Sequence, residues 1–264
     1  MKGPLRIGIV GGAGWLGGAI AESILEAGLT TSSSLSLSYR SQQSGQFPDA
    51  FWTSDNQALV ERADVVVLCV RPQDWTALSV HTKGKLVISV MAGIRLSALS
   101  ERHKTDRVVR TLPNAAAKVR RSYTPWIGSV GVGEGDRAIV RAIFNACGTQ
   151  DEVERENDID YLTGLTGSGP AFPALLAAAM MKDAVAHGLP NDIARRGVTT
   201  VLLGAGRLLE HGDQCPNEIV EAFLSYRGTT AAAIEHMRTA GFDDAIAEGL
   251  QAAFRKSVSM GETP

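Results

Sequence analysis

Two stretches of the chain combine small and hydroxylated residues at spacings that suit anion binding. The first contains Gly12, Gly14 and Gly17, between a short apolar run and an amphipathic stretch. In a Gly-x-Gly-x-x-Gly pattern, one glycine permits a tight turn, the next lets the backbone approach a pyrophosphate, and the third lets a helix pack on a strand. Gly11 offers a second register three residues before Gly14, so which glycine makes which contact stays open. The pattern predicts a dinucleotide whose pyrophosphate lies on exposed N–H groups of a helix start.

The second stretch is Ser225–Thr230, Ser-Tyr-Arg-Gly-Thr-Thr, which directly precedes another helical segment. The N–H groups of Gly228, Thr229 and Thr230 are expected to point at an anion, with the hydroxyl groups of Ser225 and Thr230 beside them. Such a helix start suits a small carboxylate. Taken alone, the stretch is more typical of an ordinary capped helix start.

The residues after the second predicted strand indicate which dinucleotide binds. In NAD enzymes an acidic residue at this strand end binds the ribose 2′-hydroxyl, whereas an arginine suits the 2′-phosphate of NADP. Here the strand runs into Tyr39, Arg40 and Ser41, with no carboxylate. The sequence therefore favours NADPH, and the alternative is a solvated arginine in a turn.

Apolar runs with the length of buried strands position these residues. The predicted strands are 7–10, 35–39, 64–70, 86–90, 107–111, 129–132 and 151–153, and helices are predicted at 19–28, 55–63 and 136–147. Continuous apolar runs are typical of parallel strands covered on both faces. Ligands in open α/β sheets bind outside the carboxyl ends of the strands. The ends at 71–73, 91–93 and 112–114 are therefore candidate nicotinamide contacts.

The character of the chain changes near Asn157, after which only helical periodicity is found. The predicted helices are 170–187, 191–210, 217–224, 229–239 and 242–260. Their many alanines, with small residues on several faces, indicate burial in a bundle or against a second subunit. The predicted fold is a doubly wound, mostly parallel α/β Rossmann domain over 1–156, followed by an all-helical domain over 157–264.

Composition excludes several classes of function. The 264 residues carry a formal net charge of −2, which gives no reason to expect nucleic acid or an anionic membrane as partner. Three widely spaced cysteines form no Cys/His ligand cluster, so neither a disulfide scaffold nor a metal site is predicted. We expect no signal peptide before the first strand, and no apolar run approaches the length of a membrane span. The expected location is the cytoplasm.

Seven motifs together resemble the pyrroline-5-carboxylate reductase family over essentially the whole chain. They are GGAGWLG, Asn56, CVRPQ, SVMAGI, RTLPNAAA, LTGSGPAF and YRGTT, which match in type, order and spacing. The resemblance implies reduction of a cyclic imine carboxylate, 1-pyrroline-5-carboxylate, to proline with NADPH in proline biosynthesis. It also implies an N-terminal Rossmann domain and C-terminal helices that interlock in a homodimer and sometimes in a larger ring.

The resemblance also implies roles for individual residues. The pyrophosphate would be held by Gly12, Ala13, Gly14, Trp15 and Leu16. Other cofactor contacts would come from Asn56 on the adenosine side, and from Cys69, Val70, Arg71, Pro72, Ala92, Gly93 and Asn114 on the ribose and nicotinamide side. Thr230 would hydrogen-bond the ring nitrogen, and the substrate carboxylate would lie on Ser225, Gly228 and Thr229. Thr230 and Ser225 are thus the candidate catalytic residues.

The chain departs from the family pattern in the second anion-binding stretch. Tyr226 and Arg227 replace Pro-Gly, so Arg227 could pair with the substrate carboxylate or redirect the pocket toward a related cyclic imine. A second alternative is a β-hydroxyacid dehydrogenase, which requires a lysine where this chain has Pro173. A third is a non-catalytic NADP-binding paralogue.

Overall fold

The computed structural model describes residues 4–212 and 214–262. The chain divides into two compact units, which we call the sheet unit and the helical unit. The sheet unit contains the described residues up to Ser168 and those from Ala252 onward, and the helical unit contains Gly169–Gln251. This division differs from the predicted one at 156/157, because a short helix at 156–162 and the last turns of the C-terminal helix pack with the sheet.

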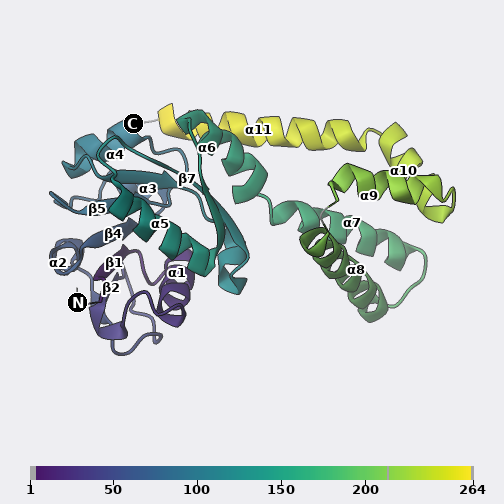
Figure 1. The fold of residues 1–264 in the computed structure, drawn as a ribbon. Helices are drawn as coiled ribbons and strands as arrows, with labels where there is room; N and C mark the ends of the chain where they lie inside the picture. Colours follow the sequence, from purple (N-terminus) through teal and green to yellow (C-terminus); the bar gives the residue numbers. More distant parts are fainter. Residues whose placement is uncertain (1–3, 213, 263–264) are drawn as a thin grey trace. The chain divides into compact units, whose positions relative to one another are not determined.

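An eight-stranded sheet forms the centre of the sheet unit (Figure 1). The strands are β1 (Ile7–Val10), β2 (Leu35–Ser38), β3 (Phe51–Thr53), β4 (Val65–Leu68), β5 (Leu86–Ser89), β6 (Val108–Thr111), β7 (Ser122–Gly128) and β8 (Gly148–Glu152). Their order is β3-β2-β1-β4-β5-β6-β7-β8, and only the β6–β7 pair is antiparallel among the strand pairs of the described residues. The chain reverses direction across the sheet after β3, so β1 and β4 flank the switch point at which open α/β sheets bind ligands.

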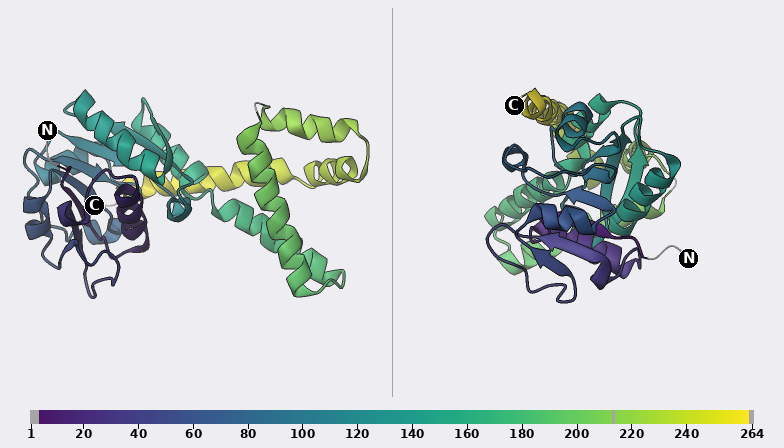
Figure 2. Two further views of the ribbon diagram at one scale, coloured as in Figure 1. Left: turned by 60° about the horizontal axis from the view of Figure 1, so that its bottom comes forward. Right: turned by 90° about the vertical axis from the view of Figure 1, so that its left-hand side faces the viewer.

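Helices cover both faces of this sheet (Figure 1 and Figure 2). They are α1 (Trp15–Glu26), α2 (Asn56–Arg62), α3 (Pro72–Trp75), α4 (Leu96–His103), α5 (Glu134–Cys147) and α6 (Glu156–Leu162). Side chains on successive strand residues point to opposite faces. One apolar cluster joins the strands to α1 and α5, and the other joins them to α2, α3 and α4. The predicted doubly wound, mostly parallel α/β fold is confirmed.

The predicted strand at 129–132 is wrong. These residues form a turn, in which the N–H of Val132 donates to Ser129 O at 3.0 Å. A Cβ at Gly131 would lie 2.4 Å from Asp106 O, so this turn is pressed closely against the chain before β6. The strand is instead β7, whose Pro125 lacks an N–H but whose carbonyl accepts from Leu112 at 3.1 Å. Proline weakens a strand prediction, which is why this element was missed.

The helical unit consists of helices alone within its described residues. They are α7 (Ala171–Ala186), α8 (Asn191–His211), α9 (Pro216–Ser225), α10 (Thr229–Thr239) and the first part of α11 (Phe242–Glu262). Helix α7 packs on α8, and α9 packs on α10. None of the 16 residues of α7 is buried, so the burial expected from its composition is not reached within this chain.

A network of buried charges anchors α6 and the end of α11 to the sheet. Arg110 in β6 donates to Asp160 Oδ1 at 2.5 Å and to Glu156 Oε1 at 3.0 Å. Ser257 Oγ in α11 also donates to Asp160 Oδ1, at 3.0 Å. The Arg110 and Asp160 side chains are each 1% exposed. These contacts are the physical reason why residues 252–262 belong to the sheet unit.

Candidate functional site

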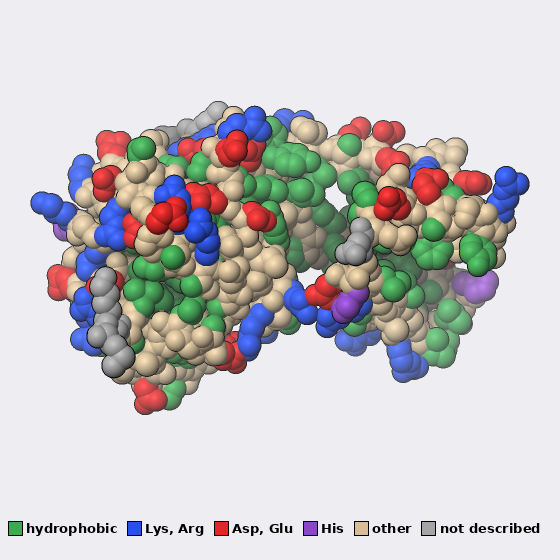
Figure 3. Space-filling model, viewed as in Figure 1, with side chains coloured by type: hydrophobic (Ala, Val, Ile, Leu, Met, Phe, Trp, Pro, Cys, Tyr) green, Lys and Arg blue, Asp and Glu red, His purple; other side chains and the backbone are tan. Residues whose placement is uncertain are grey.

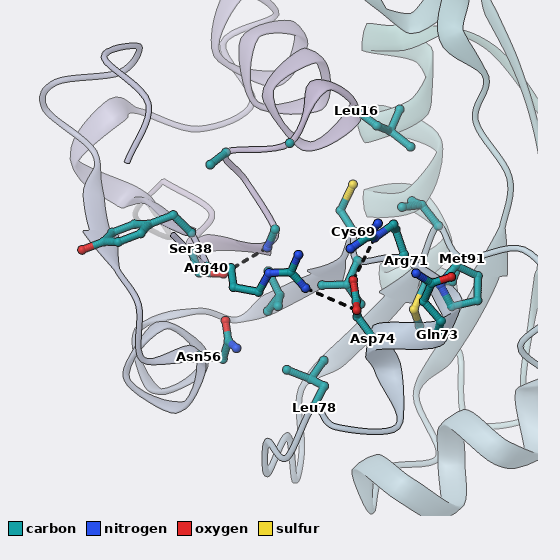
Figure 4. Close-up of a pocket in the computed structure, with 18 of the residues that line it drawn as sticks. Leu16, Ser38, Arg40, Asn56, Cys69, Arg71, Gln73, Asp74, Leu78 and Met91 are labelled. Carbon is teal, nitrogen blue, oxygen red and sulfur yellow. Dashed lines mark hydrogen bonds and ion pairs between the residues drawn. The ribbon is translucent and has the colours of Figure 1, made fainter. Parts of the chain in front are cut away.

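A pocket of about 930 Å³ opens at the carboxyl edge of the sheet, within the sheet unit (Figure 4). Its walls come from the turn after β1 and from the ends of β2, β4 and β5. These ends lie together because parallel strands finish at the same edge of a sheet. The pocket therefore lies where the topology predicts a ligand.

The glycine turn forms one wall, and its backbone geometry shows where Gly11 and Gly17 leave no room for a side chain. Gly11 has a φ of +84°, and a Cβ there would lie 2.3 Å from Cys69 O. A Cβ at Gly17 would lie 2.5 Å from Gly11 O. Gly11 thus makes the tight turn, and Gly17 allows helix α1 to lie closely against that turn. The N–H of Gly11 donates to Ser38 Oγ at 3.0 Å, which ties this turn to the end of β2.

The start of helix α1 faces the same pocket. Gly14 is the N-cap residue, with extended backbone and no side-chain cap, and Trp15 and Leu16 follow in the first turn. The first N–H groups of a helix have no intrahelical acceptor and carry the positive end of the helix dipole. An anionic group such as a pyrophosphate fits this cradle, because Gly14 leaves the backbone uncovered.

Two cations and one carboxylate lie at the rim of the pocket. Arg40 Nη1 lies 3.3 Å from Asp74 Oδ1, and Arg71 Nε donates to Asp74 Oδ2 at 2.9 Å (Figure 4). The Arg71 hydrogen bond holds the pKa of Asp74 below its usual value, with a further contribution from the charges of both arginines. Asp74 is therefore ionised at neutral pH. Two guanidinium groups that converge on one oxyanion also suit a phosphate dianion.

The structure brings most of the predicted cofactor residues together. Those that line the pocket are Ala13, Gly14, Trp15, Leu16, Tyr39, Arg40, Asn56, Cys69, Val70, Arg71, Pro72 and Ala92. Gln73, part of the strand end predicted at 71–73, also lines the pocket, whereas sequence reasoning missed Ser38, Asp74 and Leu78, which line it too. Asp74 directly follows Pro72-Gln73, and a short helix after this strand end was the signal that could have found it.

Four predicted cofactor residues do not line the pocket, and three of them have other contacts. A Cβ at Gly12 would lie 2.8 Å from Leu37 Cδ2, so this glycine lies against β2. Gly93, with a φ of +79°, lies against Met260 near the end of α11. Asn114 is buried; its amide donates to Thr166 O at 2.9 Å and its oxygen accepts from the N–H of Ala116. Ser41 is exposed in the loop after β2.

The predicted substrate residues lie in the helical unit, in the turn between α9 and α10. Ser225 ends α9 and its hydroxyl donates to Ala222 O at 2.8 Å. Gly228 is the extended N-cap residue of α10, so Thr229 and Thr230 occupy its first turn with exposed side chains. Arg227 has a φ of +50°, a left-handed conformation that favours glycine.

Within the described residues, no helix is long and apolar enough to cross a membrane. The same residues contain no group of three or more His, Cys, Asp or Glu side chains placed to hold a metal ion.

Two family models match the chain. Residues 156–260 match the model described as pyrroline-5-carboxylate reductase dimerisation, and residues 6–93 match the one described as NADP oxidoreductase coenzyme F420-dependent. The first begins one residue before the predicted helical domain, and the second ends in the loop after β5.

Relatives and solved structures match between 79% and 97% of the chain. The pyrroline-5-carboxylate reductase of Synechocystis is 33% identical over 79% of both chains, and that of Methanosarcina acetivorans is 30% identical over 97% of this chain and 98% of its own. The Streptococcus pyogenes structure of 1-pyrroline-5-carboxylate reductase has a TM-score of 0.84 at 27% identity, covering 96% of this chain and 98% of that one. A Plasmodium falciparum pyrroline carboxylate reductase with NADP bound shares the fold, with a TM-score of 0.85 at 24% identity over 97% and 98% of the chains.

Fold, pocket and sequence similarity therefore agree. The chain belongs to the pyrroline-5-carboxylate reductase family.

Proposed function

We propose that this protein reduces 1-pyrroline-5-carboxylate to L-proline with NADPH. In the net reaction, the imine carbon would gain a hydride and the ring nitrogen a proton, which gives L-proline and NADP⁺. The observation that carries the proposal is the pocket at the sheet edge, with its glycine turn and two arginines, in a chain of this family. Bound NADPH would supply the hydride, and the protein supplies binding and orientation.

The preference for NADPH over NADH rests on the charges at the rim. Arg40 and Arg71 offer two guanidinium groups to a 2′-phosphate. The end of β2 carries Ser38, Tyr39 and Arg40, and none of these is the acidic residue that would bind a ribose 2′-hydroxyl. Asn56 would meet the adenosine side of the cofactor. Arg71, which the family resemblance assigned to the ribose and nicotinamide side, is proposed here for the 2′-phosphate because it shares Asp74 with Arg40. The other residues of the loops after β4 and β5 would meet the ribose and nicotinamide.

The substrate is assigned to the turn between α9 and α10. The first-turn N–H groups and the Thr229 and Ser225 hydroxyls would hold the carboxylate, with Gly228 allowing close approach. Thr230 would hydrogen-bond the ring nitrogen. An imine that is already protonated needs orientation and one polar contact at nitrogen more than a strong general acid. This requirement suits a stretch without histidine or carboxylate.

Arg227 supports a second candidate function, reduction of a related cyclic imine carboxylate. Its left-handed backbone carries a long cationic side chain where the family pattern has glycine. A guanidinium there could pair with a carboxylate bidentately. By contrast, Pro173 lies in the first turn of α7, where a β-hydroxyacid dehydrogenase requires a lysine as acid–base group.

The test is NADPH oxidation with five- and six-membered cyclic imine carboxylates. We expect the highest kcat/KM with 1-pyrroline-5-carboxylate, and a loss of about 10²-fold or more in Thr230→Ala, the order found when a hydrogen-bond donor to a reacting group is removed. Thr239→Ala is the matched control, because Thr239 is on the same helix and its hydroxyl donates to Glu235 O. Turnover of only another imine would select the second candidate. NADPH binding without any turnover would identify a non-catalytic protein and refute the enzymatic proposal.

We also propose a homodimer formed through the C-terminal helices. The helical unit exposes many large apolar side chains (Figure 3). On α7 and α8 they include Leu175, Val201, Leu203 and Leu208, at 72%, 57%, 67% and 68% exposure. A monomer with this surface in water would be unfavourable, since burying one such side chain contributes about 1.5–3 kcal/mol.

Light scattering tests the assembly. We expect twice the 28.0 kDa chain mass, or a larger even multiple if dimers join in a ring. Leu203→Asp should yield monomers, whereas Val130→Asp, at an even more exposed apolar site in the sheet unit, should leave the mass unchanged. A monomeric wild-type protein would refute the proposed dimer.

A further inference from the structure

In the cofactor pocket, two cationic side chains pair with a single carboxylate. Among its described lining residues, Arg40 and Arg71 are the only cations and Asp74 is the only carboxylate. Both guanidinium groups contact that one carboxylate, at 3.3 and 2.9 Å, and Figure 4 shows the two side chains reaching Asp74 from different elements. The anion-binding position at the rim is therefore taken by a group of the chain itself.

We propose that Asp74 is a specificity-determining residue that competes with the cofactor 2′-phosphate for Arg40 and Arg71. This inference rests on the proposed preference for NADPH, and it assigns to the Asp74 carboxylate an effect that reduces that preference. The two arginines favour the cofactor that carries a 2′-phosphate, NADPH. Asp74 weakens that preference because it pairs with the same two guanidinium groups. The affinity for NADH, which has no 2′-phosphate, is not affected by this competition.

The exposure of the three groups makes the exchange feasible. The Arg40 side chain is 75% exposed and the Arg71 side chain 61% exposed, so both can turn toward a ligand without unpacking the core. Asp74 itself is one-third exposed and lies in the first turn of the four-residue helix α3. A carboxylate that stays beside a phosphate dianion repels it well within one Debye length.

Asp74 also sets the net charge of this site. With Asp74 ionised, the three groups carry one net positive charge, and with asparagine in its place they would carry two. Asparagine keeps the shape and an oxygen that can accept from Arg71, so the substitution removes charge rather than contact. We therefore expect NADPH to bind Asp74→Asn three- to tenfold more tightly, with NADH affinity changed less than twofold.

The experiment is isothermal titration calorimetry of the full-length protein with NADPH, NADH, and the fragments 2′,5′-ADP and 5′-AMP. Asp64→Asn is the matched control, because Asp64 also makes an ion pair with an arginine, Arg6, but lies outside the pocket. We expect Asp74→Asn alone to tighten 2′,5′-ADP and NADPH binding. The salt dependence of NADPH binding should also become steeper, because the site gains a net charge.

Two results would overturn the inference while leaving the proposed function intact. Weaker NADPH binding by Asp74→Asn would mean that the carboxylate positions the arginines for the phosphate. Unchanged NADPH binding would mean that the carboxylate neither competes with the 2′-phosphate nor positions the arginines. A wild-type protein that binds NADH as tightly as NADPH would instead refute the cofactor preference on which the inference rests. Thermal unfolding of each variant shows whether it is folded.

Discussion

Removal of the Asp160 carboxylate should destabilise the sheet unit strongly. Asp160 pairs with Arg110 at 2.5 Å and Arg95 at 3.1 Å, and it accepts from Ser257 at 3.0 Å. In Asp160→Ala the buried guanidinium of Arg110 keeps only Glu156, whose side chain is 25% exposed. Breaking a buried ion pair by removing one partner costs about 3–5 kcal/mol. Because Glu156 partly compensates, we expect a loss of about 3 kcal/mol.

Urea unfolding followed by tryptophan fluorescence is a suitable assay. All four tryptophans, at positions 15, 52, 75 and 126, belong to the sheet unit, so the signal reports that unit alone. A loss of 3 kcal/mol corresponds to a midpoint about 1–2 M lower in urea, for a slope of about 2 kcal/mol/M.

The control lies in the same helix. Asp158 pairs with Arg155, whose side chain is 77% exposed, so Asp158→Ala should cost less than about 1 kcal/mol. Replacing both Arg110 and Asp160 by leucine should cost less than Asp160→Ala alone, because the two fully buried charges are then removed together and only the partly exposed Glu156 and Arg95 lose a partner. Equal midpoints for Asp160→Ala and Asp158→Ala would refute the reasoning.

Three further predictions concern single positions. Gly11→Ala should lower the free energy of unfolding by about 3 kcal/mol or more, measured in urea, because its Cβ would lie 2.3 Å from Cys69 O and the backbone there is left-handed. The same substitution should abolish NADPH binding in calorimetry. The hydrogen bond from Arg107 lowers the pKa of Asp136. The stability that this pair contributes is therefore present above about pH 4 and is lost as pH falls through the lowered pKa, as Tm measured from pH 6 to 3 would show. Burial raises the pKa of the Cys147 thiol to about 11, so at pH 8 the exposed Cys215 should react with Ellman's reagent far faster.

Each of these has its own control. Gly28 also has a positive φ, of +68°, but nothing lies within 4 Å of its Cβ position, so Gly28→Ala should cost only about 1–2 kcal/mol. Asp136→Asn should have a lower Tm at neutral pH, and its Tm should fall less between pH 6 and pH 3. Cys215→Ser should remove the fast-reacting thiol. An acid response unchanged in Asp136→Asn, or a fast thiol that persists in Cys215→Ser, would contradict these assignments.

Several features could be predicted from the sequence because they depend on local patterns. The glycine turn, the apolar strands that flank it and the helices of the C-terminal part follow from spacing, periodicity and caps within about 20 residues. Arg40 could be assigned for the same reason, since it directly follows a strand with a recognisable alternation. The helix predicted at 229–239 matches α10 residue for residue.

The tertiary structure decided the rest, because it depends on contacts between residues far apart in the chain. Arg40 and Asp74 meet only because β2 and β4 end at the same edge on either side of β1. The direction of β7 follows from its pairing with β6, which no local pattern contains. An arginine on a strand is expected to be exposed. Arg110 is nevertheless buried, because Asp160, 50 residues later in the sequence, supplies the opposite charge. Local sequence determined which elements form, and packing between them determined which charges face one another.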